Sequence, residues 1–570
     1  MAKWLIRNKV KVDDDLLLIE KLAKVRGIKN LDEWMNPPSS VVFTPYSLEY
    51  IDEAVTKIIA AIHKQMKIVI VADIDTDGVC STAIMYNYLR ELTPNVSYIH
   101  AQRSHGHGLE TVLDQIEDDV DLVIVVDSSS NSVEACKQLY DKNIPIVIID
   151  HHKISKENKY ACIVNCQMGD YPNKNLSGSA MCYKVCQVLD EYLDIELADE
   201  FRDLSAIGIV ADMMDIRNME NRYLVYNGIN NISNLGIREI LKQSKIDYGD
   251  GINTTNISFK IAPIIGACSR FDKIELALEL VTCDDEDRVK ELVKEMVEMN
   301  ELRKKNQKKY VESAVDSIDT SNNIIIYVDN DIDSGFRGLI ATEFAERFQK
   351  PVLVLSHFTY EPDKDGVKEE NKYMGSARSI GVIPLQSLCI DSGLFHFAEG
   401  HEGAFGVSFA EEDLNKIISY FNDTLDSTDL QKAIEYDLEL EANDIDELDI
   451  LQVEKFAKIV GQGFPEPKFL VKGLVIEEGY TKKLGNHVRA VMGANNDTVK
   501  LICEDSFALM KFRTQSNYGE DVESHFNDVD NFATEIEAIG SLNLNNFYHG
   551  GLRRYVTTKQ VFLEDYRITD

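Results

Sequence analysis

Positive charge is scarce in this sequence. Its 570 residues include 60 Lys and Arg against 96 Asp and Glu, so the formal net charge is −36. An acidic chain is not attracted to polyanions at long range, which argues against tight, non-specific coating of nucleic acid. A local basic groove is still compatible with this balance, although each cluster of Lys and Arg taken singly is more often a solvated surface face. The candidate clusters are Arg303, Lys304, Lys305, Lys308 and Lys309; Lys482, Lys483 and Arg489; and Arg553 and Arg554.

Secretion signals and long apolar runs are also missing. The start, M-A-K-W-L-I-R, is no signal peptide, and no apolar stretch is long enough to span a bilayer. We therefore expect no membrane contact. The ten cysteines are scattered, mostly within apolar segments, which favours a soluble, cytoplasmic protein over a disulfide framework. Two pairs, Cys162 with Cys166 and Cys182 with Cys186, leave zinc binding as an alternative to a role in the core.

One stretch, V-A-D-I-D-T-D-G-V-C-S at residues 71–81, places three aspartates at alternate positions. The apolar run before it is typical of a buried parallel strand, and an apolar-periodic helix follows it. A single Asp would suit a helix N-cap. Three carboxylates crowded in one turn repel one another and lose hydration unless a cation compensates. We interpret Asp73, Asp75 and Asp77 as one wall of a metal site.

Further polar groups close other apolar runs up to about residue 225, where strands and helices alternate as a doubly wound sheet requires. L-V-I-V-V-D ends at Asp127, I-P-I-V-I-I-D-H-H ends at Asp150, His151 and His152, and a fourth strand-like run, A-I-G-I-V-A-D, reaches Asp212. Because the carboxyl ends of parallel strands share one rim of the sheet, we expect all these groups to meet there. Alone, the His-His pair would fit a turn, but together with the aspartates it indicates a metal site.

Oxygen and imidazole ligands without thiolates suit Mn²⁺ or Mg²⁺, and the imidazole favours Mn²⁺. Five carboxylates and one histidine exceed what one ion needs. Two ions about 3.5–4 Å apart, sharing one carboxylate, fit better and imply hydrolysis of a phosphate ester. The predicted metal ligands are Asp73, Asp75, Asp77, Asp127, His151 and Asp212.

The rest of the chain divides by pattern into further segments. Residues 230–320 are helical and charged and predict a long connecting helix; the apolar spacing is too short and irregular for the alternative, a dimerising coiled coil. A second α/β pattern follows, and polar turns between later strands indicate a small antiparallel barrel, a fold that often binds single strands. The predicted boundaries are 1–50 (N-terminal helical segment), 51–230 (catalytic α/β domain), 231–320 (helical connector), 321–430 (second α/β domain), 431–550 (acidic linker, helix and barrel) and 551–570 (C-terminal tail).

Two glycine-containing motifs in the second α/β segment indicate contacts with phosphate. M-G-S-A-R-S places Gly375 and Ser376 beside Arg378, and G-H-E-G-A-F-G places Gly400 beside His401. Glycine turns let backbone amides approach phosphate oxygens, and Arg binds such oxygens in pairs. Either motif alone is weak, because glycine turns between strands are common.

Taken together, these motifs resemble the RecJ single-strand-specific exonucleases of the DHH phosphoesterase superfamily. D-I-D-T-D-G-V-C-S is similar to the family's D-x-D-x-D-G-x-x-S, Asp150-His151-His152 to its name-giving DHH, and G-I-V-A-D-M-M to its G-x-V-A-D-V. I-A-P-I-I-G-A-C-S-R, G-S-A-R-S, G-H-E-G-A-F-G and G-Q-G-F-P-E-P-K-F resemble later motifs in the same order, so the resemblance covers nearly the whole chain. It implies an α/β DHH domain with a parallel doubly wound sheet, a long connecting helix, a DHH-associated α/β domain and a C-terminal OB-like β-barrel.

The resemblance also implies roles for individual residues. Asp127 would bridge two Mn²⁺ (or Mg²⁺) ions and, with Asp150 and His152, form the catalytic set, in which His152 contacts the scissile phosphate. The chain departs from the family at Ser128-Ser129, where Cys-Gly is usual, and at Glu399, where Gly is usual. These departures bear on substrate grip more than on metal chemistry. The residues expected to bind the substrate are Arg378, Ser376, Gly375, His401, Gly400 and Arg270.

The implied function is a two-metal 5′→3′ exonuclease that hydrolyses single-stranded DNA to mononucleotides in DNA repair or recombination, acting as a monomer. Its partners would be single-stranded DNA and, by the same resemblance, a single-strand-binding protein or a helicase. One alternative is a DHH-family oligoribonuclease or cyclic-dinucleotide phosphodiesterase, which would not need the barrel. Another is a non-catalytic replication or repair factor, whose hallmark would be lost metal aspartates; here all are present.

Overall fold

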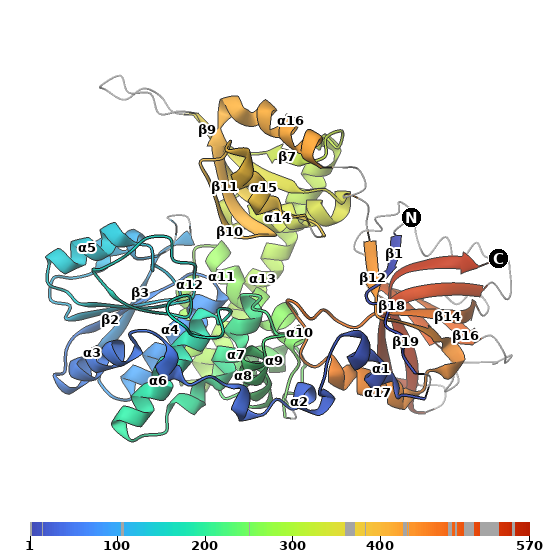
Figure 1. Cartoon of the computed structure of the whole chain (residues 1–570), viewed down its shortest axis with the longest axis horizontal. Helices are drawn as coiled ribbons and strands as arrows, with labels where there is room; N and C mark the ends of the chain where they lie inside the picture. Colours follow the sequence, from blue (N-terminus) through green and yellow to red (C-terminus); the bar gives the residue numbers. More distant parts are fainter. Residues whose placement is uncertain are drawn as a thin grey trace. The chain divides into compact units, whose positions relative to one another are not determined.

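The structure is a computed structural model of the chain, drawn in Figure 1, and it divides into two compact units. The parallel-sheet unit comprises Asp32–Lys305 and Lys458–Pro465, and the barrel unit comprises Met1–Leu31, Asn306–Ala457 and Glu466–Asp570. The residues that the structure describes are 3–13, 15–103, 106, 108–249, 251–359, 371–381, 383–425, 430, 433–476, 482–484, 487–494, 507–512, 535–549 and 553–569.

Five strands form one sheet in the parallel-sheet unit. They are β2 (Ile68–Ala72), β3 (Val96–His100), β4 (Leu122–Val126), β5 (Ile146–Asp150) and β6 (Cys162–Asn165), in the spatial order β3-β2-β4-β5-β6. Every pair of neighbours is parallel. β2, β4 and β5 are buried at each position, as apolar strands covered on both faces should be. The predicted doubly wound parallel sheet is therefore confirmed.

Helices cover both faces of this sheet (Figure 1). α3 (Ile51–His63), α4 (Thr76–Arg90) and α6 (Gly178–Leu193) pack on one face. α5 (Val133–Asp141) packs on the other, where its apolar side meets alternate strand residues such as Val69, Val71, Val123 and Val125. α7 (Arg202–Ala211) packs against α4 and α6, and α8 (Met219–Asn230) packs against α7. The helices on both faces thereby hold the sheet, and with it the carboxyl ends of its strands, in place.

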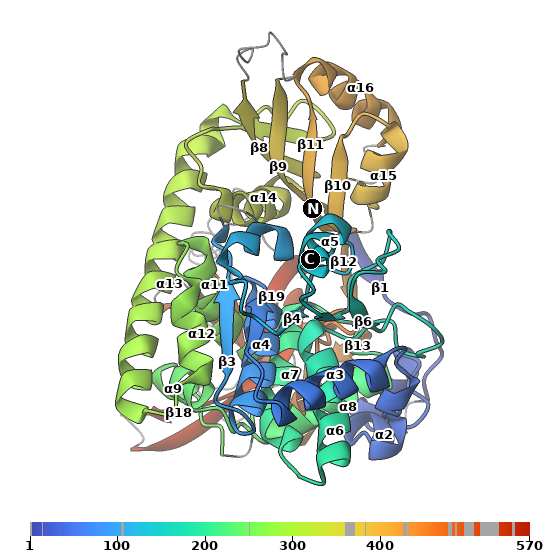
Figure 2. The same ribbon diagram turned by 90° about the vertical axis from the view of Figure 1, so that its left-hand side faces the viewer.

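Helices also make up most of residues 231–320, as predicted. They are α9 (Leu235–Gln243), α10 (Thr254–Asn256), a π-helical turn (Ile257–Ile261), α11 (Ala262–Arg270), α12 (Ile274–Thr282) and α13 (Glu286–Ala314). α13 is one unbroken helix of 29 residues, seen along its length in Figure 2. Its apolar residues Val289, Leu292, Val293 and Met296 are buried within the chain, which argues against the coiled-coil alternative.

A second, mixed sheet lies in the barrel unit. Its strands β7 (Ile325–Val328), β8 (Val352–Phe358), β9 (Lys372–Arg378), β10 (Phe397–His401) and β11 (Ala404–Ala410) follow the order β10-β11-β9-β8-β7. Only β7 and β8 are parallel. The helices of this segment are α14 (Ser334–Phe348), α15 (Leu385–Ser392) and α16 (Leu414–Thr424). Leu353, Phe405 and Phe421 belong to the core that joins α15 and α16 to the sheet.

Later strands close into a ring, which agrees with the predicted barrel. β14 (Phe469–Ile476), β16 (His487–Ala494), β17 (Phe507–Phe512), β19 (Arg554–Thr569) and β18 (Glu535–His549) pair in this order, and β18 pairs back to β14. Only the pair of β17 and β19 is parallel. Five strands in a closed ring are also what an OB-fold has, although the OB-like assignment stays a prediction. β13 (Leu438–Glu441) and β15 (Lys482–Leu484) extend the sheet, and α17 (Glu447–Phe456) precedes β14.

Both ends of the chain differ from the prediction. The N-terminal segment, predicted to be helical, begins with β1 (Lys3–Ile6), which pairs in parallel with β12 (Ala433–Tyr436); α1 (Leu18–Val25) and α2 (Leu31–Met35) follow. Residues 554–569, predicted as a tail, form β19 and pair along the length of β18. Both strands depend on partners that no local pattern reveals. In the described part of the chain, no helix has the length and apolar character that crossing a membrane requires.

Candidate metal centre

Acidic side chains gather at the carboxyl ends of β2 and β4. These strands are neighbours, but the strands that follow them in the chain, β3 and β5, lie on opposite outer sides of the pair. Ligands of open α/β sheets bind where the strand order reverses in this way. Asp73 follows β2 and Asp127 follows β4 at that point.

The turn after β2 carries three aspartates. Asp75 caps α4 by accepting a hydrogen bond from Gly78 N at 2.9 Å, and Asp77 lies in the first turn of the helix. An added Cβ at Gly78 would lie 2.6 Å from the Cβ of Asp73, so glycine allows the helix to begin this close to the strand end. Asp73 and Asp77 are buried and Asp75 is exposed. The N-cap role thus explains one aspartate and leaves two for another purpose.

Two further glycines make room for buried carboxylates. Asp77 accepts hydrogen bonds from Gly178 N at 2.7 Å and Ser179 N at 3.1 Å, at the start of α6. An added Cβ at Gly208 of α7 would overlap Asp77 Oδ1, and one at Gly178 would overlap Asp127 Oδ1. A side chain at either position would displace a carboxylate from the cluster.

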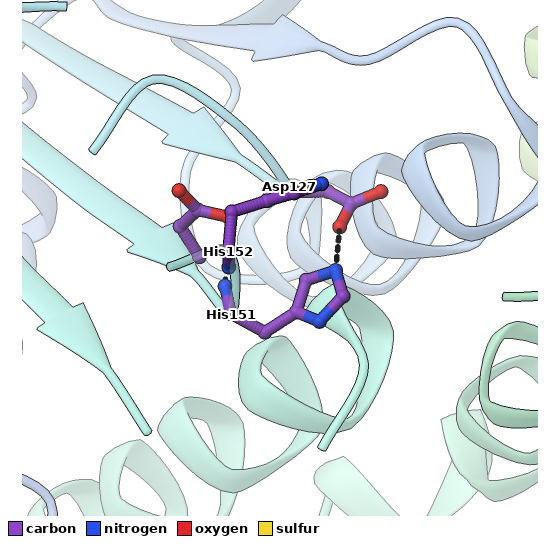
Figure 3. Close-up of side chains that lie close together, drawn as sticks. Asp127, His151 and His152 are labelled. Carbon is purple, nitrogen blue, oxygen red and sulfur yellow. Dashed lines mark hydrogen bonds and ion pairs between the residues drawn. The ribbon is translucent and has the colours of Figure 1, made fainter. Parts of the chain in front are cut away.

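Asp127 and Asp212 meet at His151. The His151 Nε2 atom lies 3.2 Å from Asp127 Oδ1 and 3.4 Å from Asp212 Oδ2. Figure 3 shows the imidazole turned toward the Asp127 carboxylate. Asp127 has a φ of +60°, and its buried Oδ1 accepts no hydrogen bond from the residues described. A sparsely populated backbone conformation and an unsatisfied buried oxygen together point to a functional site.

Asp150 and His152 form an adjoining pair. Asp150 is fully buried at the end of β5 and accepts hydrogen bonds from the backbone of Ser130, His151 and His152 and from His152 Nδ1 at 2.8 Å. Burial opposes its charge, but the His152 hydrogen bond and the two nearby imidazoles outweigh burial and lower the pKa of Asp150. Burial likewise opposes the imidazolium, but Asp150 raises the pKa of His152 to about 9. The His152 side chain is 48% exposed, so a cationic donor faces solvent at neutral pH.

Three of the other carboxylates, those of Asp75, Asp77 and Asp127, have raised pKa values. Crowding by surrounding protein atoms removes hydration from the Asp75 carboxylate, although the residue as a whole is exposed; together with the charges of Asp73, Asp212 and Asp77, this raises the pKa of Asp75 to about 7. Burial and the charge of Asp212 raise the pKa of Asp77. Burial and the neighbouring aspartates raise the pKa of Asp127 well above its usual range. The common cause is crowded like charge with little water, which a divalent cation would relieve.

The donor set fits a divalent cation. Carboxylate oxygens with imidazole nitrogen, and no thiolate, suit Mn²⁺ and Mg²⁺. A cation would also satisfy the buried Asp127 Oδ1. Three overlapping groups each bring their ligand atoms within 4.8 Å of one another: Asp127, Asp150, His151 and His152; Asp77, His151 and Asp212; and Asp73, Asp75 and Asp127.

All six predicted metal ligands lie in this cluster, but one arrives from an unexpected element. Asp212 was predicted to end a fourth strand and instead caps the C-terminus of α7. α7 is buried at almost every position. A segment that is buried on all sides is apolar at nearly every position, so its sequence has no period that separates a helix from a strand. The predicted strand is therefore wrong, although Asp212 does reach the cluster.

The first predicted phosphate-binding motif lies within a paired strand, whereas the second runs from β10 through a turn at Glu402 and Gly403 into β11. Gly375, Ser376 and Arg378 belong to β9, and Gly400 and His401 belong to β10. An added Cβ at Gly375 would overlap Val354 O, so this glycine serves the close approach of β8 and β9. In the sheet register, Ala404 of β11 pairs with Arg378 on one side and with His401 on the other. The side chain of His401 lies outside the described part of the structure.

Arg378 lies beside α14. An added Cβ at Gly338 would be 2.6 Å from an Arg378 guanidinium nitrogen. Arg378 also lines a cavity of about 260 Å³ with residues of α14 and with Ser379, Ile380 and Gly381. The glycine in α14 therefore leaves space for this guanidinium group.

Arg270 ends α11, in the same unit as the acidic cluster. Thr76 Oγ1 donates to Ala262 O at 3.5 Å and so links the start of α11 to the start of α4. Arg103, which follows β3, donates from its guanidinium to Ser269 Oγ at 3.2 Å, next to Arg270 in the chain. No signal in the sequence marks Gly178 and Gly208, because only the assembled fold shows what they contact.

The paired cysteines support a core role. Cys162, Cys166, Cys182 and Cys186 are buried and free, and none belongs to a metal-capable group among the residues described. Burial raises the pKa of Cys162 to about 12 and that of Cys166 to about 11, so both thiols stay neutral. A metal ligand must be the thiolate, which makes the zinc alternative unfavourable here.

Part of the chain matches a known domain family. Residues 67–209 match the DHH family, N-terminal domain. This range contains the parallel sheet, the aspartate turn and the Asp-His-His sequence at the end of β5. The parallel-sheet unit thus contains a DHH domain.

The whole chain is similar to RecJ. It is 28% identical to the SPbeta prophage-derived YorK of Bacillus subtilis over 92% of each chain. It is 29% identical to the single-stranded-DNA-specific exonuclease RecJ of Bacillus subtilis, over 85% of this chain and 62% of that protein. The fold matches RecJ of Thermus thermophilus in complex with Mn²⁺ with a TM-score of 0.76 at 20% identity, covering 100% of this chain and 80% of that one. A complex of the same protein with Mg²⁺ gives a TM-score of 0.71 at 20% identity, covering 100% and 79%. The chain thus resembles RecJ over most of its sequence and in its fold.

Proposed function

We propose that this chain is a metal-dependent exonuclease that hydrolyses phosphodiester bonds of single-stranded DNA. The observation that carries the proposal is the meeting of five aspartates and His151, drawn from β2, α4, β4, β5 and α7, at one point of the sheet. Similarity to RecJ of Bacillus subtilis, a single-stranded-DNA-specific exonuclease, supports the choice of substrate. The 5′→3′ direction, the pair of ions, the mononucleotide products and a role in DNA repair or recombination belong to the same proposal.

The residues divide into metal ligands and phosphate contacts. Divalent cations bound in the cluster would withdraw charge from the phosphate oxygens and make water more acidic. His152 is oriented by Asp150 and stays protonated at neutral pH, so it would donate a hydrogen bond to the scissile phosphate. Asp127, central to two of the three ligand groups, is the proposed bridge. The proposed ligands are Asp73, Asp75, Asp77, Asp127, His151 and Asp212.

The residues proposed to contact the DNA backbone lie in β9, β10 and α11. Ser376 and Arg378 are two residues apart in β9, which places them on the same face of the sheet. His401 shares their sheet one strand beyond β11. The glycines Gly375 and Gly400 keep these strands close, and Arg270 would add a contact from the parallel-sheet unit.

An end-labelled hydrolysis assay with the purified full chain tests the proposal. With Mn²⁺, we expect mononucleotides from the 5′ end of single-stranded DNA, little release from duplex, and none in EDTA. Asp127→Asn should reduce hydrolysis to background while the fold persists. Asp118→Asn, at a carboxylate in the same unit whose side chain is 87% exposed, is the matched control and should keep full activity.

A second variant separates phosphate contact from metal binding. His152→Ala should lower kcat by about 10²–10³-fold, the usual loss when one donor to a charged transition state is removed. Its Mn²⁺ binding, measured by calorimetry, should stay close to that of the unmodified chain. Full activity in Asp127→Asn would refute the proposed site.

The same assay distinguishes the alternatives. Turnover of dinucleotides or short RNA, without hydrolysis of long DNA, would identify an oligoribonuclease or cyclic-dinucleotide phosphodiesterase. Mn²⁺ binding without hydrolysis of any of these substrates would identify a non-catalytic factor. We further propose that the protein acts as a cytoplasmic monomer with a single-strand-binding protein or helicase as partner. Nine free cysteines among the described residues fit a reducing compartment.

A further inference from the structure

The loop that carries Asp212 is braced by a distant part of the chain. Asp212 ends α7, and residues 213–218 lead from it to α8. Lys458–Pro465, which we name the strap, belong to the same compact unit as this loop. In the chain, however, the strap lies between α17 and β14, and both flanking segments belong to the barrel unit.

The strap contacts the loop directly after Asp212. Ile216 N donates to Gln462 O at 3.2 Å. Gly463 has a φ of +76°, and an added Cβ there would overlap Asp215 Oδ1 and lie 2.5 Å from Arg217 Nε. Glycine alone meets both demands, because it tolerates a left-handed backbone and leaves the two side chains their space.

Asp215 gives the loop its shape. Its carboxylate accepts hydrogen bonds from Arg217 N at 2.9 Å and from the Arg217 guanidinium at 3.0 and 2.6 Å. Its carbonyl accepts hydrogen bonds from Asn221 Nδ2 at 3.1 Å and Asn218 N at 3.3 Å. A displaced Asp215 would therefore alter the backbone three residues after Asp212.

The strap is itself firmly held. Thr254 Oγ1 donates to Val460 O at 2.7 Å and accepts from Val460 N at 2.9 Å. Phe464 is buried with its ring centroid 4.8 Å from that of Trp34. The buried Arg222 guanidinium lies 3.9 Å above the same Trp34 ring. These contacts make the strap a rigid support for the loop.

We propose that the strap is a positioning element of the metal centre: by bracing the loop at Asp215 and Ile216, it aims the Asp212 carboxylate at His151 and sets the affinity for divalent cations. The inference rests on the proposed metal site. Asp212 Oδ2 lies 3.4 Å from His151 Nε2, so a loop shift of about 1 Å would take it out of ligand range. The strap, which lies between two segments of the barrel unit in the sequence, thus sets the cation affinity of a site in the other unit.

Calorimetric titration of the full chain with Mn²⁺ tests this role. Gly463→Ala should weaken Mn²⁺ binding by about 10-fold, as the loss of support around a ligand usually does. Gly393→Ala is the matched control, because Gly393 also has a left-handed φ, of +65°, but has no atom within 4 Å of an added Cβ. Both variants carry the same backbone penalty, and only the first disturbs the loop. Equal Mn²⁺ affinity in the two variants would overturn the inference.

A second pair of variants decides the matter if Gly463→Ala does not fold. Thr254→Val removes the hydroxyl that holds the strap and touches neither the loop nor the cluster, so Mn²⁺ binding should weaken; Thr254→Ser keeps the hydroxyl and should restore it. Equal affinity for Thr254→Val and Thr254→Ser would refute the strap's role. Mn²⁺ binding by the unmodified chain that Asp127→Asn abolishes would uphold the metal site in either case. If the unmodified chain binds no Mn²⁺, the proposed function itself fails.

Discussion

Replacing Gly208 by Ala sets two known effects against each other. In a helix, Ala is favoured over Gly by about 0.5–1 kcal/mol. At this position the new Cβ would overlap Asp77 Oδ1 and Ser179 Oγ and lie 2.8 Å from Ser179 Cβ, well inside the separation of about 3.5–4.0 Å at which carbon atoms attract. Overpacking of this kind costs about 1–3 kcal/mol. We therefore expect a net loss of about 1–2 kcal/mol, or roughly 2–3 °C in Tm for a unit of this size.

The same substitution should also weaken cation binding. The new Cβ can be accommodated only if the Asp77 carboxylate moves and breaks its hydrogen bonds with Gly178 N and Ser179 N. Gly208→Ala should therefore weaken Mn²⁺ binding by about 10-fold. Scanning calorimetry in EDTA and Mn²⁺ titration measure the two effects. Gly266→Ala in α11 is the control, because an added Cβ there has no atom within 4 Å, and it should gain about 0.5–1 kcal/mol with unchanged Mn²⁺ binding. A Gly208→Ala chain as stable as the control, with undiminished Mn²⁺ affinity, would refute the reasoning.

Three further predictions concern stability. The pKa of Asp75 is raised in the fold, so the stability associated with its protonated carboxyl is fully present at low pH and is lost as pH rises through about 7. The Tm in EDTA should therefore fall from pH 5 to pH 8. Added Mn²⁺ should raise the Tm most at pH 8, where the carboxyl is ionised. Arg26→Met should cost about 1–3 kcal/mol in urea unfolding, because it removes the bidentate partner of the fully buried Asp437 at 2.8 and 2.7 Å and leaves Arg7 Nε, at 3.2 Å, to compensate that charge; a loss below 1 kcal/mol would contradict this. Lys184→Met should cost a similar amount, since Lys184 and Glu220 are both fully buried and paired at 2.8 Å, and the two variants should affect different unfolding transitions because the pairs lie in different units.

The parallel sheet could be predicted because its strands are buried on both faces. Such strands read as short continuous apolar runs, and their ends were marked by Asp73, Asp127 and Asp150. The run from Ile51 to His63 forms α3, and its apolar residues recur with the period of a helix. The grouping of the predicted ligands followed from one rule, that parallel strands end at a common rim.

What could not be predicted depends on contacts between distant residues. The run before Asp212 is apolar on all sides, so its period could not separate helix from strand. β1 needs β12, and β19 needs β18, before either is a strand in a sheet. Gly463 reads as an ordinary loop residue until Asp215 is found beside it. The order of motifs along the chain does not reveal which distant residues contact one another.

The ligands of the cluster and the strap that supports them are made at different times during synthesis. The ligands span Asp73 to Asp212, and the strap that braces the last of them begins at Lys458. During synthesis, the chain must grow from Asp212 to beyond Lys458 before the strap can contact the loop. If the strap positions Asp212 as proposed, a nascent chain that ends before Lys458 would bind divalent cations more weakly than a chain that includes the strap.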